Sequence, residues 1–241
     1  MIPLADDNPT RRPALVTLAL IAINIAVYLW IQPNGADPAR SAEFTYAHAA
    51  IPCEVTTNQP LSDVELQTHT CNTLPEGPPH FAHKSVWLAI LVSMFLHGSL
   101  LHIGGNMLFL WIFGNNIEDQ LGRVGFLAFY LVGGVVATIA HIAVQPSSTV
   151  PMIGASGAIA AVMGAYLAWF PNARIRTLII FGLIFLRDIT AKWLLLFWFL
   201  SQFFEAVNPN SGVAWMAHVG GFAFGIVVGL CLRATRGAQQ R

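Results

Sequence analysis

Ser156 is the residue of this sequence best suited to act as a nucleophile, because it stands in the small-residue run Gly154-Ala155-Ser156-Gly157. A nucleophilic serine needs uncrowded backbone, so that a carbonyl can approach and amide N–H groups can face the developing oxyanion. Gly154 and Gly157 supply that space, and we assign them to the oxyanion and substrate-binding region. The run alone is weak evidence, because small residues also fill ordinary contacts between membrane helices.

Three further polar side chains in apolar surroundings could assist such a serine. His218 is a candidate general base, although a single histidine in a membrane helix is more often a hydrogen-bonded helix contact. His102 and Asn106 are four residues apart and share one helix face, where both could donate hydrogen bonds to an oxyanion. Their simpler role would be to hold two helices together. We interpret His97 and His141 as structural or interfacial.

The composition indicates a membrane protein. Hydrophobic residues make up 55% of the 241 residues and charged residues 10%, against about 25% charged residues in soluble domains. The formal net charge is zero, so nothing suggests a nucleic-acid partner, and no residue pattern indicates a cofactor.

The apolar residues fall into six blocks long enough to cross a bilayer, which predicts an all-α, polytopic membrane protein with a six-helix bundle. We expect one membrane domain over residues 1–241, with a tail at 1–13, a long polar loop at 33–86 and a second tail at 233–241. Two further apolar stretches, 85–96 and 175–186, are too short to span and are expected at the membrane interface. The predicted spans are 14–31, 101–117, 125–144, 153–170, 191–207 and 212–232.

Basic residues predict the orientation of these spans. Six spans place both termini on one side, together with ten of the twelve lysines and arginines, whereas Arg40 and Lys84 lie opposite. This asymmetry predicts cytoplasmic termini and an outward-facing long loop. We expect a bacterial cytoplasmic membrane location without a cleavable signal peptide, and Asp6 and Asp7 argue against an organellar transit peptide. The ten residues are Arg11, Arg12, Arg123, Arg174, Arg176, Arg187, Lys192, Arg233, Arg236 and Arg241.

The long loop contains two of the three cysteines, Cys53 and Cys71. In an oxidising compartment a disulfide between them is plausible. The alternative is a zinc site that adds His80 and His83, but the spacing matches no familiar zinc pattern. Cys231, in the last span, is expected to be a small core residue.

Ser156 and His218 each lie a few residues inside the outer end of a span, and each continues into a stripe of small residues. Such stripes let helix backbones approach closely. Because the stripes are in phase with the serine and the histidine, close packing would bring Oγ and the imidazole within hydrogen-bonding reach. No Asp or Glu lies inside a span at this depth, so we expect a Ser-His dyad. The stripes are Ser156, Ala160, Gly164 and Ala168, and His218, Gly221, Gly225 and Gly229.

Three motifs together resemble the rhomboid family of intramembrane serine proteases: the segment from His97 to Asn106, the run around Ser156, and the segment from Ala217 to Gly225. The resemblance extends from about residue 93 to 232. It implies a six-helix rhomboid-like bundle, Ser156 as nucleophile and His218 as general base. It also implies an oxyanion hole formed by His102, Asn106 and the Ser156 backbone N–H.

The sequence departs from many relatives at two positions. Trp87 is followed by Leu88 where many relatives have a Trp-Arg pair, and Ala160 stands where some relatives place a tyrosine that stacks on the histidine. Neither departure removes a reacting group.

The resulting hypothesis is an intramembrane serine endopeptidase that cleaves single-span transmembrane or membrane-anchored proteins. A non-catalytic rhomboid-like protein that escorts clients is the alternative, and a histidine-based metal or proton transporter is a weaker one, since no metal-binding motif is present. The span at 191–207 lacks a small-residue stripe and connects through Asn208-Pro209-Asn210, so we expect it to be the lateral substrate gate, with Phe197 and Trp198 in its wall.

Overall fold

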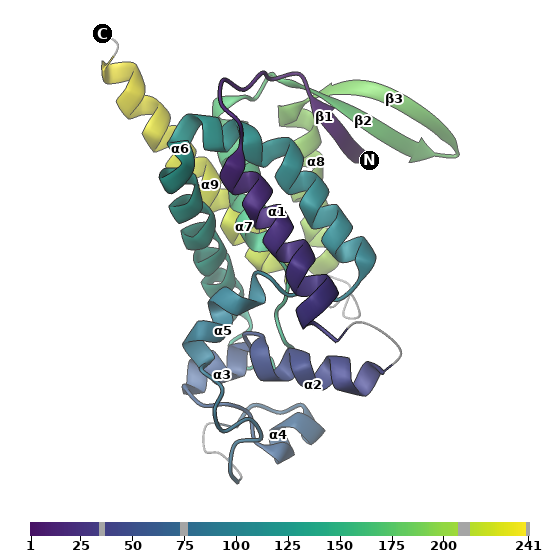
Figure 1. Ribbon diagram of the computed structural model, residues 1–241, viewed down its shortest axis with the longest axis vertical. Helices are drawn as coiled ribbons and strands as arrows, with labels where there is room; N and C mark the ends of the chain where they lie inside the picture. Colours follow the sequence, from purple (N-terminus) through teal and green to yellow (C-terminus); the bar gives the residue numbers. More distant parts are fainter. Residues whose placement is uncertain (34–36, 73–76, 207–212, 240–241) are drawn as a thin grey trace.

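The computed structural model describes residues 1–33, 37–72, 77–206 and 213–239. Long helices run side by side along the long axis of the molecule, with a small sheet at one end and short helices at the other (Figure 1). The N-terminal strand and the last turns of the final helix both lie at the sheet end (Figure 1). The long helices are α1 (Leu15–Ala26), continued by the π-helical turn η1 (Val27–Ile31), α6 (Leu100–Val144), α7 (Ser156–Trp169), α8 (Ala191–Ala206) and α9 (Trp215–Gln239).

Two of the described helices, Leu100–Val144 and Trp215–Thr235, are long and apolar enough to cross a membrane, and Leu15–Ile31 and Ser156–Trp169 are shorter apolar helices. The predicted helical bundle is therefore confirmed, whereas the count of six spans stays a prediction. The predicted turn at 208–210 and the start of the predicted sixth span lie outside the described residues.

Helix α6 contains two of the predicted spans. Gly122 interrupts it with φ 72° and ψ 167°, a left-handed conformation that glycine adopts without steric cost. The two resulting arms meet at the sheet end (Figure 1). Just before the break, the buried Glu118 carboxylate accepts hydrogen bonds from the Val16 and Thr17 backbone N–H groups, at 2.9 and 2.7 Å. Glu118 thereby caps the start of α1, whose first N–H groups have no acceptor within the helix.

Helix α7 lies at the centre of the bundle and packs mainly against α9 and α6. A Cβ atom added at Gly225 of α9 would lie 1.9 Å from the Ala161 carbonyl oxygen, and one at Gly164 of α7 would lie 2.1 Å from the Phe222 oxygen. Only glycine permits this approach. The close packing predicted from the two stripes is present, although on α7 the contact face also includes Gly157, Ala161 and Ala165 from the adjoining row.

The prediction of an all-α fold is wrong at the end of the molecule where the chain near Arg174 and Arg187 lies. Three antiparallel strands form a sheet in the order β1-β2-β3: β1 (Ile2–Asp6), β2 (Arg174–Phe181) and β3 (Leu183–Thr190). The apolar stretch expected at the interface is the β2–β3 hairpin, which turns at Gly182 with φ 68° and projects sideways from the bundle (Figure 1). The hairpin forms because its β-branched residues favour strands and because β1 supplies a distant partner strand.

The sequence predicts a long polar loop at 33–86, and the structure shows that its described part contains three helices. We call residues 37–72 and 77–85 the outer cap. It contains α2 (Pro38–His48), α3 (Pro52–Thr57) and α4 (Asp63–Thr68), and it is followed by the short helix α5 (Val86–Ser93). Ser62 and Glu65 form a capping box at the start of α4, each bonding the other's backbone N–H.

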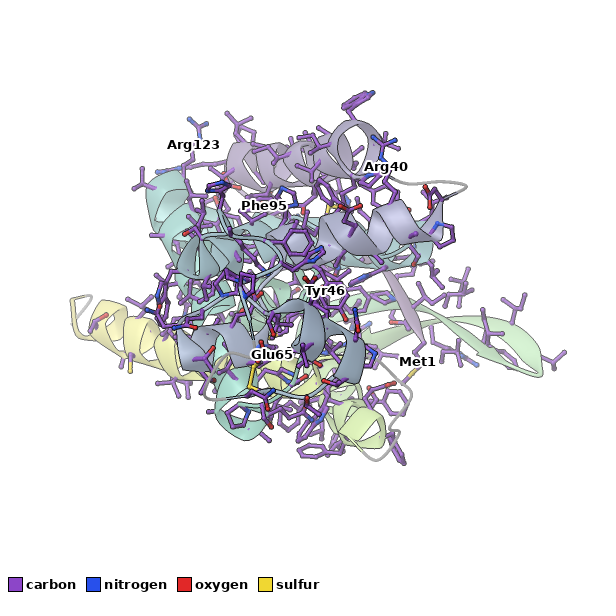
Figure 2. All side chains as sticks on the ribbon, turned by 90° about the horizontal axis from the view of Figure 1, so that it is seen from below. Met1, Arg40, Tyr46, Glu65, Phe95 and Arg123 are labelled. Atoms are coloured by element: carbon purple, nitrogen blue, oxygen red, sulfur yellow. A yellow bond between two sulfur atoms is a disulfide. The ribbon has the colours of Figure 1, made fainter. Side chains whose placement is uncertain are left out.

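The outer cap is cross-linked by a disulfide between Cys53 and Cys71, visible in Figure 2, which looks onto this end of the molecule. The predicted disulfide is therefore present, and the zinc alternative loses both of its thiolate ligands.

Candidate active site

The bundle brings Ser156 and His218 together. Ser156 is the first residue of α7, and His218 lies one turn into α9. The Ser156 Oγ atom lies 2.8 Å from His218 Nε2, a normal hydrogen-bond distance. Both side chains are half-buried. The glycine contacts between α7 and α9 hold the two helix backbones at the separation that this hydrogen bond requires.

The segment before Ser156 is tied to neighbouring elements by backbone hydrogen bonds. Gly154 has φ 122°, a conformation that favours glycine, and its N–H donates to the Ser93 carbonyl oxygen at 2.9 Å. The Met152 N–H donates to the Ala50 oxygen of the outer cap at 2.8 Å. This segment therefore delivers Ser156 to the end of α7 in a defined position.

His102 lies beside the same segment. A Cβ atom added at Gly154 would lie 2.7 Å from His102 Nε2 and 3.5 Å from Ser156 Oγ, so the three groups converge at Gly154. A side chain at position 154 would collide with the imidazole. The absence of a side chain therefore leaves room between His102 and the serine.

Asn106 follows one turn later on α6 and is 8% exposed. Its buried Nδ2 has no hydrogen-bond partner within the part of the chain that the structure describes. Since a buried amide donor normally has an acceptor, Asn106 is suited to an acceptor that arrives with a substrate. Gly157 has a packing role, because an added Cβ would lie 2.7 Å from the Ala137 Cβ.

His97 and His141 are both buried. The side-chain amide of Gln32 bonds the backbone N–H and carbonyl of His97, at 2.9 and 3.1 Å, and the His97 ring meets the His102 ring edge to face. His97 thus supports His102 from behind. Among the described residues, His141 Nδ1 is buried without a hydrogen-bond partner.

The two residues expected in the gate wall point in different directions. The Phe197 side chain belongs to the outward face of α8 and is 55% exposed. Trp198 faces inward, where its ring centroid lies 5.9 Å from that of His218. Trp198 thus lies near the imidazole of His218. In some relatives this histidine is stacked by a tyrosine, at the position where this chain has Ala160.

Gln202, one turn beyond Trp198 on α8, also contacts the histidine and is missed by the sequence analysis. Its Oε1 atom lies 2.6 Å from His218 Nδ1. A glutamine inside an otherwise apolar span was the available signal, but a search restricted to carboxylates passes over it.

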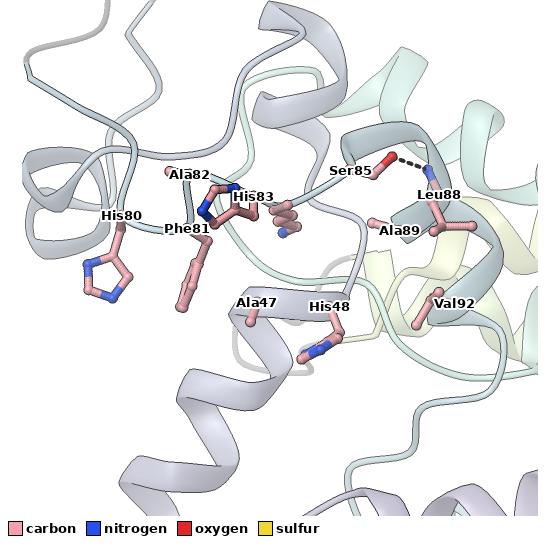
Figure 3. A pocket seen from close by; sticks show the side chains of 11 residues that line it. Ala47, His48, His80, Phe81, Ala82, His83, Ser85, Leu88, Ala89 and Val92 are labelled. Carbon is pink, nitrogen blue, oxygen red and sulfur yellow. Dashed lines mark hydrogen bonds between the residues drawn. The ribbon is translucent and has the colours of Figure 1, made fainter.

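A separate pocket between the outer cap and α5 is lined by His48, Phe81 and His83 of the cap and by Leu88 of α5 (Figure 3). His80 hydrogen-bonds Asp63 at its rim. The pocket contains neither Ser156 nor His218 and is not part of the candidate site.

Comparisons with known proteins show the family to which the chain is similar. The model of the rhomboid domain matches residues 84–235, which is more than half of the chain. The chain is similar to the presenilin-associated rhomboid-like protein A, mitochondrial, of Danio rerio, at 38% identity over 96 residues, 39% of this chain and 25% of that protein. It is 32% identical to the mitochondrial rhomboid protein 1 of Saccharomyces cerevisiae over 92 residues, 36% of this chain and 27% of that protein.

A bacterial relative, the rhomboid protease GluP of Bacillus subtilis, is 37% identical over 81 residues, 34% of this chain and 15% of that protein. The matched part of the chain thus spans about a quarter or less of the length of these relatives. Because the first of them are named as mitochondrial, they do not support the predicted bacterial location. The domain match, the helical bundle and the order of the three motifs lead to one conclusion: the chain is an integral membrane protein that belongs to the rhomboid family.

Proposed function

We propose that the protein is an intramembrane serine endopeptidase. The observation that carries the proposal is the 2.8 Å contact between Ser156 Oγ and His218 Nε2 at the ends of two closely packed helices. Nucleophile and base within hydrogen-bonding reach are the signature of covalent catalysis by serine.

In the proposed reaction, Ser156 Oγ attacks the scissile carbonyl carbon while His218 Nε2 takes the hydroxyl proton. The carbonyl oxygen becomes an oxyanion and accepts hydrogen bonds from Asn106 Nδ2, from His102 and from the Ser156 backbone N–H. That N–H belongs to the first turn of α7, whose donors have no acceptor within the helix. When the tetrahedral intermediate collapses, the C–N bond breaks and His218 returns the proton to the leaving amine. Water then hydrolyses the acyl-enzyme by the same route.

The topology that we propose is a single membrane domain with six spans, made of α1 with η1, the two arms of α6, and α7, α8 and α9. The two arms are counted separately because the chain breaks direction at Gly122. The sheet end, where Arg174, Arg176 and Arg187 gather, faces the cytoplasm or the equivalent internal compartment, and the outer cap faces outward. Ser156 and His218 then lie just inside the outer membrane surface.

The proposed substrates are single-span membrane proteins, which reach the site laterally from the bilayer. Helix α8 is the proposed gate, because it lacks the glycine contacts that join α7 to α9. Because Phe197 points outward, the contact of α8 with the bundle that can be loosened without touching His218 is the stacking of Phe199 on Phe222 of α9. Phe199→Ala should raise cleavage of a transmembrane substrate.

Covalent labelling tests the proposal. A fluorophosphonate probe should modify the wild-type protein at Ser156, as located by peptide mass analysis, and a single-span substrate in liposomes should be cleaved. Ser156→Ala and His218→Ala should each abolish both reactions, and the double variant should be no worse than either single variant, because the two residues act as a unit.

Ser147→Ala is the matched control, since Ser147 is an exposed serine in the loop before α7. It should label and cleave at the wild-type rate. Cleavage by purified Ser156→Ala protein would disprove the mechanism, and a folded wild-type protein that neither labels nor cleaves would favour the non-catalytic, client-binding alternative.

A further inference from the structure

Helix α8 presents two side chains to His218, one turn apart. The Trp198 ring lies against the imidazole, and Gln202 Oε1 lies 2.6 Å from His218 Nδ1. Gln202 is 6% exposed, so this hydrogen bond is shielded from water and lipid. His218 is therefore held on both sides of its ring, by Ser156 at Nε2 and by Gln202 at Nδ1.

The orientation of the Gln202 amide follows from its other contacts. Its Nε2 atom lies 2.9 Å from the Trp198 carbonyl oxygen and 3.1 Å from Ser201 Oγ. A backbone carbonyl can only accept a hydrogen bond, so the NH₂ group of the amide must face Trp198. The amide oxygen must then face His218.

This orientation determines the tautomer of the histidine. An amide oxygen is only an acceptor, so His218 Nδ1 must carry the proton in the 2.6 Å hydrogen bond. In the neutral imidazole Nε2 then has a free lone pair, and it accepts the hydrogen bond from Ser156 Oγ–H. This is the tautomer that a general base acting through Nε2 requires.

We propose, building on the proposed protease function, that Gln202 is a positioning residue that fixes the tautomer and orientation of His218. It takes the place of a triad carboxylate with a neutral oxygen, and no proton moves to it. The Trp198 carbonyl, on the same helix, holds the amide in its working orientation. Helix α8 thus supplies part of the catalytic arrangement as well as a wall of the bundle.

Because Gln202 lies on α8, its hydrogen bond to His218 depends on the position of that helix. The Ser156–His218 contact joins α7 and α9, which are held together through glycines. Gln202 reaches His218 from α8, which contacts α9 through aromatic side chains such as Trp198 and Phe199 on Phe222. If α8 moves aside to admit a substrate, Ser156 and His218 stay together while His218 loses its Nδ1 acceptor. Efficient chemistry therefore requires α8 to return.

The test compares two length-matched variants. Gln202→Met keeps the volume but removes the acceptor, and Gln202→Glu keeps an oxygen in the same place. For Gln202→Met we expect kcat to fall about 10²-fold with KM unchanged, the usual scale for a misplaced catalytic group. The rate of fluorophosphonate labelling should fall equally, because a small probe needs the histidine but not the gate. Gln202→Glu should recover most of both rates.

Leu200→Met is the control, because Leu200 lies on the outward face of α8 and receives the same new side chain. It should behave as wild type. A purely structural role for Gln202 would instead leave kcat intact in Gln202→Met, and that result would overturn the proposal. A Gln202→Glu variant as slow as Gln202→Met would overturn it as well.

A measurement independent of activity separates this inference from the protease proposal. The 15N NMR signals of labelled His218 should report a proton on Nδ1 in the wild type and a mixture of tautomers in Gln202→Met. A proton on Nε2 in the wild type would disprove the role of Gln202 even in an active enzyme. Conversely, an Nδ1–H tautomer in a protein that fails to label at Ser156 would leave the positioning role standing while the protease proposal falls.

Discussion

The bundle and the outer cap are held together by opposite means. Between α7 and α9 the contacts are made by glycine and alanine, with backbone atoms of one helix against backbone atoms of the other. The outer cap contains a disulfide, a capping box and a buried ion pair between Lys84 and Glu54, whose charged atoms lie 2.5 Å apart.

The difference follows from the solvent around each region. Lipid tails are as apolar as leucine, so burying apolar side chains gives no advantage inside the bilayer, and close backbone packing must hold the helices. The outer cap lies in water under the proposed topology but is too small to bury much apolar surface, and small domains of this kind depend on cross-links.

The buried ion pair shows how much the outer cap relies on polar contacts. The side chains of Lys84 and Glu54 are 2% and 1% exposed, and Lys84 Nζ also donates to the Tyr46 carbonyl oxygen at 2.7 Å. Burial raises the pKa of Glu54 and lowers the pKa of Lys84, in each case against the attraction of the partner charge. Each charge is thus buried beside its counter-charge, and removal of one partner leaves the other uncompensated.

Removing one partner of this pair should have the largest effect on stability. Lys84→Met leaves the Glu54 carboxylate buried without a counter-charge, and we expect a loss of about 3–5 kcal/mol in the free energy of unfolding. Reversible unfolding in mixed detergent micelles measures it. The Lys84→Met/Glu54→Gln double variant, which buries no charge, should recover much of the loss. Additive effects of the two single variants would show that the pair is not coupled.

The disulfide should rank next. Replacing Cys53 and Cys71 together by serine releases a loop of 18 residues and should cost about 3 kcal/mol in the same unfolding assay. The predicted core position of Cys231 is wrong, because this cysteine is free and exposed on α9. Cys231→Ser is therefore the matched control, and it should leave stability unchanged. If the variant without Cys53 and Cys71 were as stable as Cys231→Ser, the outer cap would hold together without its disulfide.

Adding one methyl group to α9 tests the packing of the bundle, and of the three changes it should have the smallest effect on stability. Gly225→Ala places a Cβ 1.9 Å from the Ala161 oxygen, so α7 and α9 must separate, at a cost of about 1–3 kcal/mol. Fluorophosphonate labelling should fall with it, since the same contact sets the Ser156–His218 distance. Gly104→Ala, at a helix position with no atom within 4 Å of the new Cβ, should not destabilise the protein. If Gly225→Ala and Gly104→Ala had the same stability and the same labelling rate, close backbone packing would not be what holds the bundle together.

The predictable part of the fold is the part in which local pattern decides. Apolar length and small-residue spacing located the helices and placed Ser156 at the start of one, because both properties act within a single segment. The capping box at Ser62 and Glu65 could also have been recognised from spacing alone.

The parts that were missed depend on contacts between distant segments. The apolar stretch before Arg187 was judged by length and hydropathy, but it becomes a hairpin because Ile2–Asp6 pairs with β2. Gln202 reaches His218 only through the relative rotation of α8 and α9, which no pattern within either helix specifies. The outward orientation of Phe197 and the inward orientation of Trp198 were unresolved for the same reason.

The backbone hydrogen bonding between Ala50 and Met152 has a consequence for the synthesis and membrane insertion of the protein. The segment that delivers Ser156 takes its hydrogen-bond partner from the outer cap, which is synthesised much earlier and, in the proposed topology, must first be exported. In a nascent chain whose two segments have not yet crossed the bilayer, the hydrogen bond that positions the segment before Ser156 is missing. Membrane insertion would then act as an activation step, because the nucleophile is positioned only after both segments have crossed the bilayer.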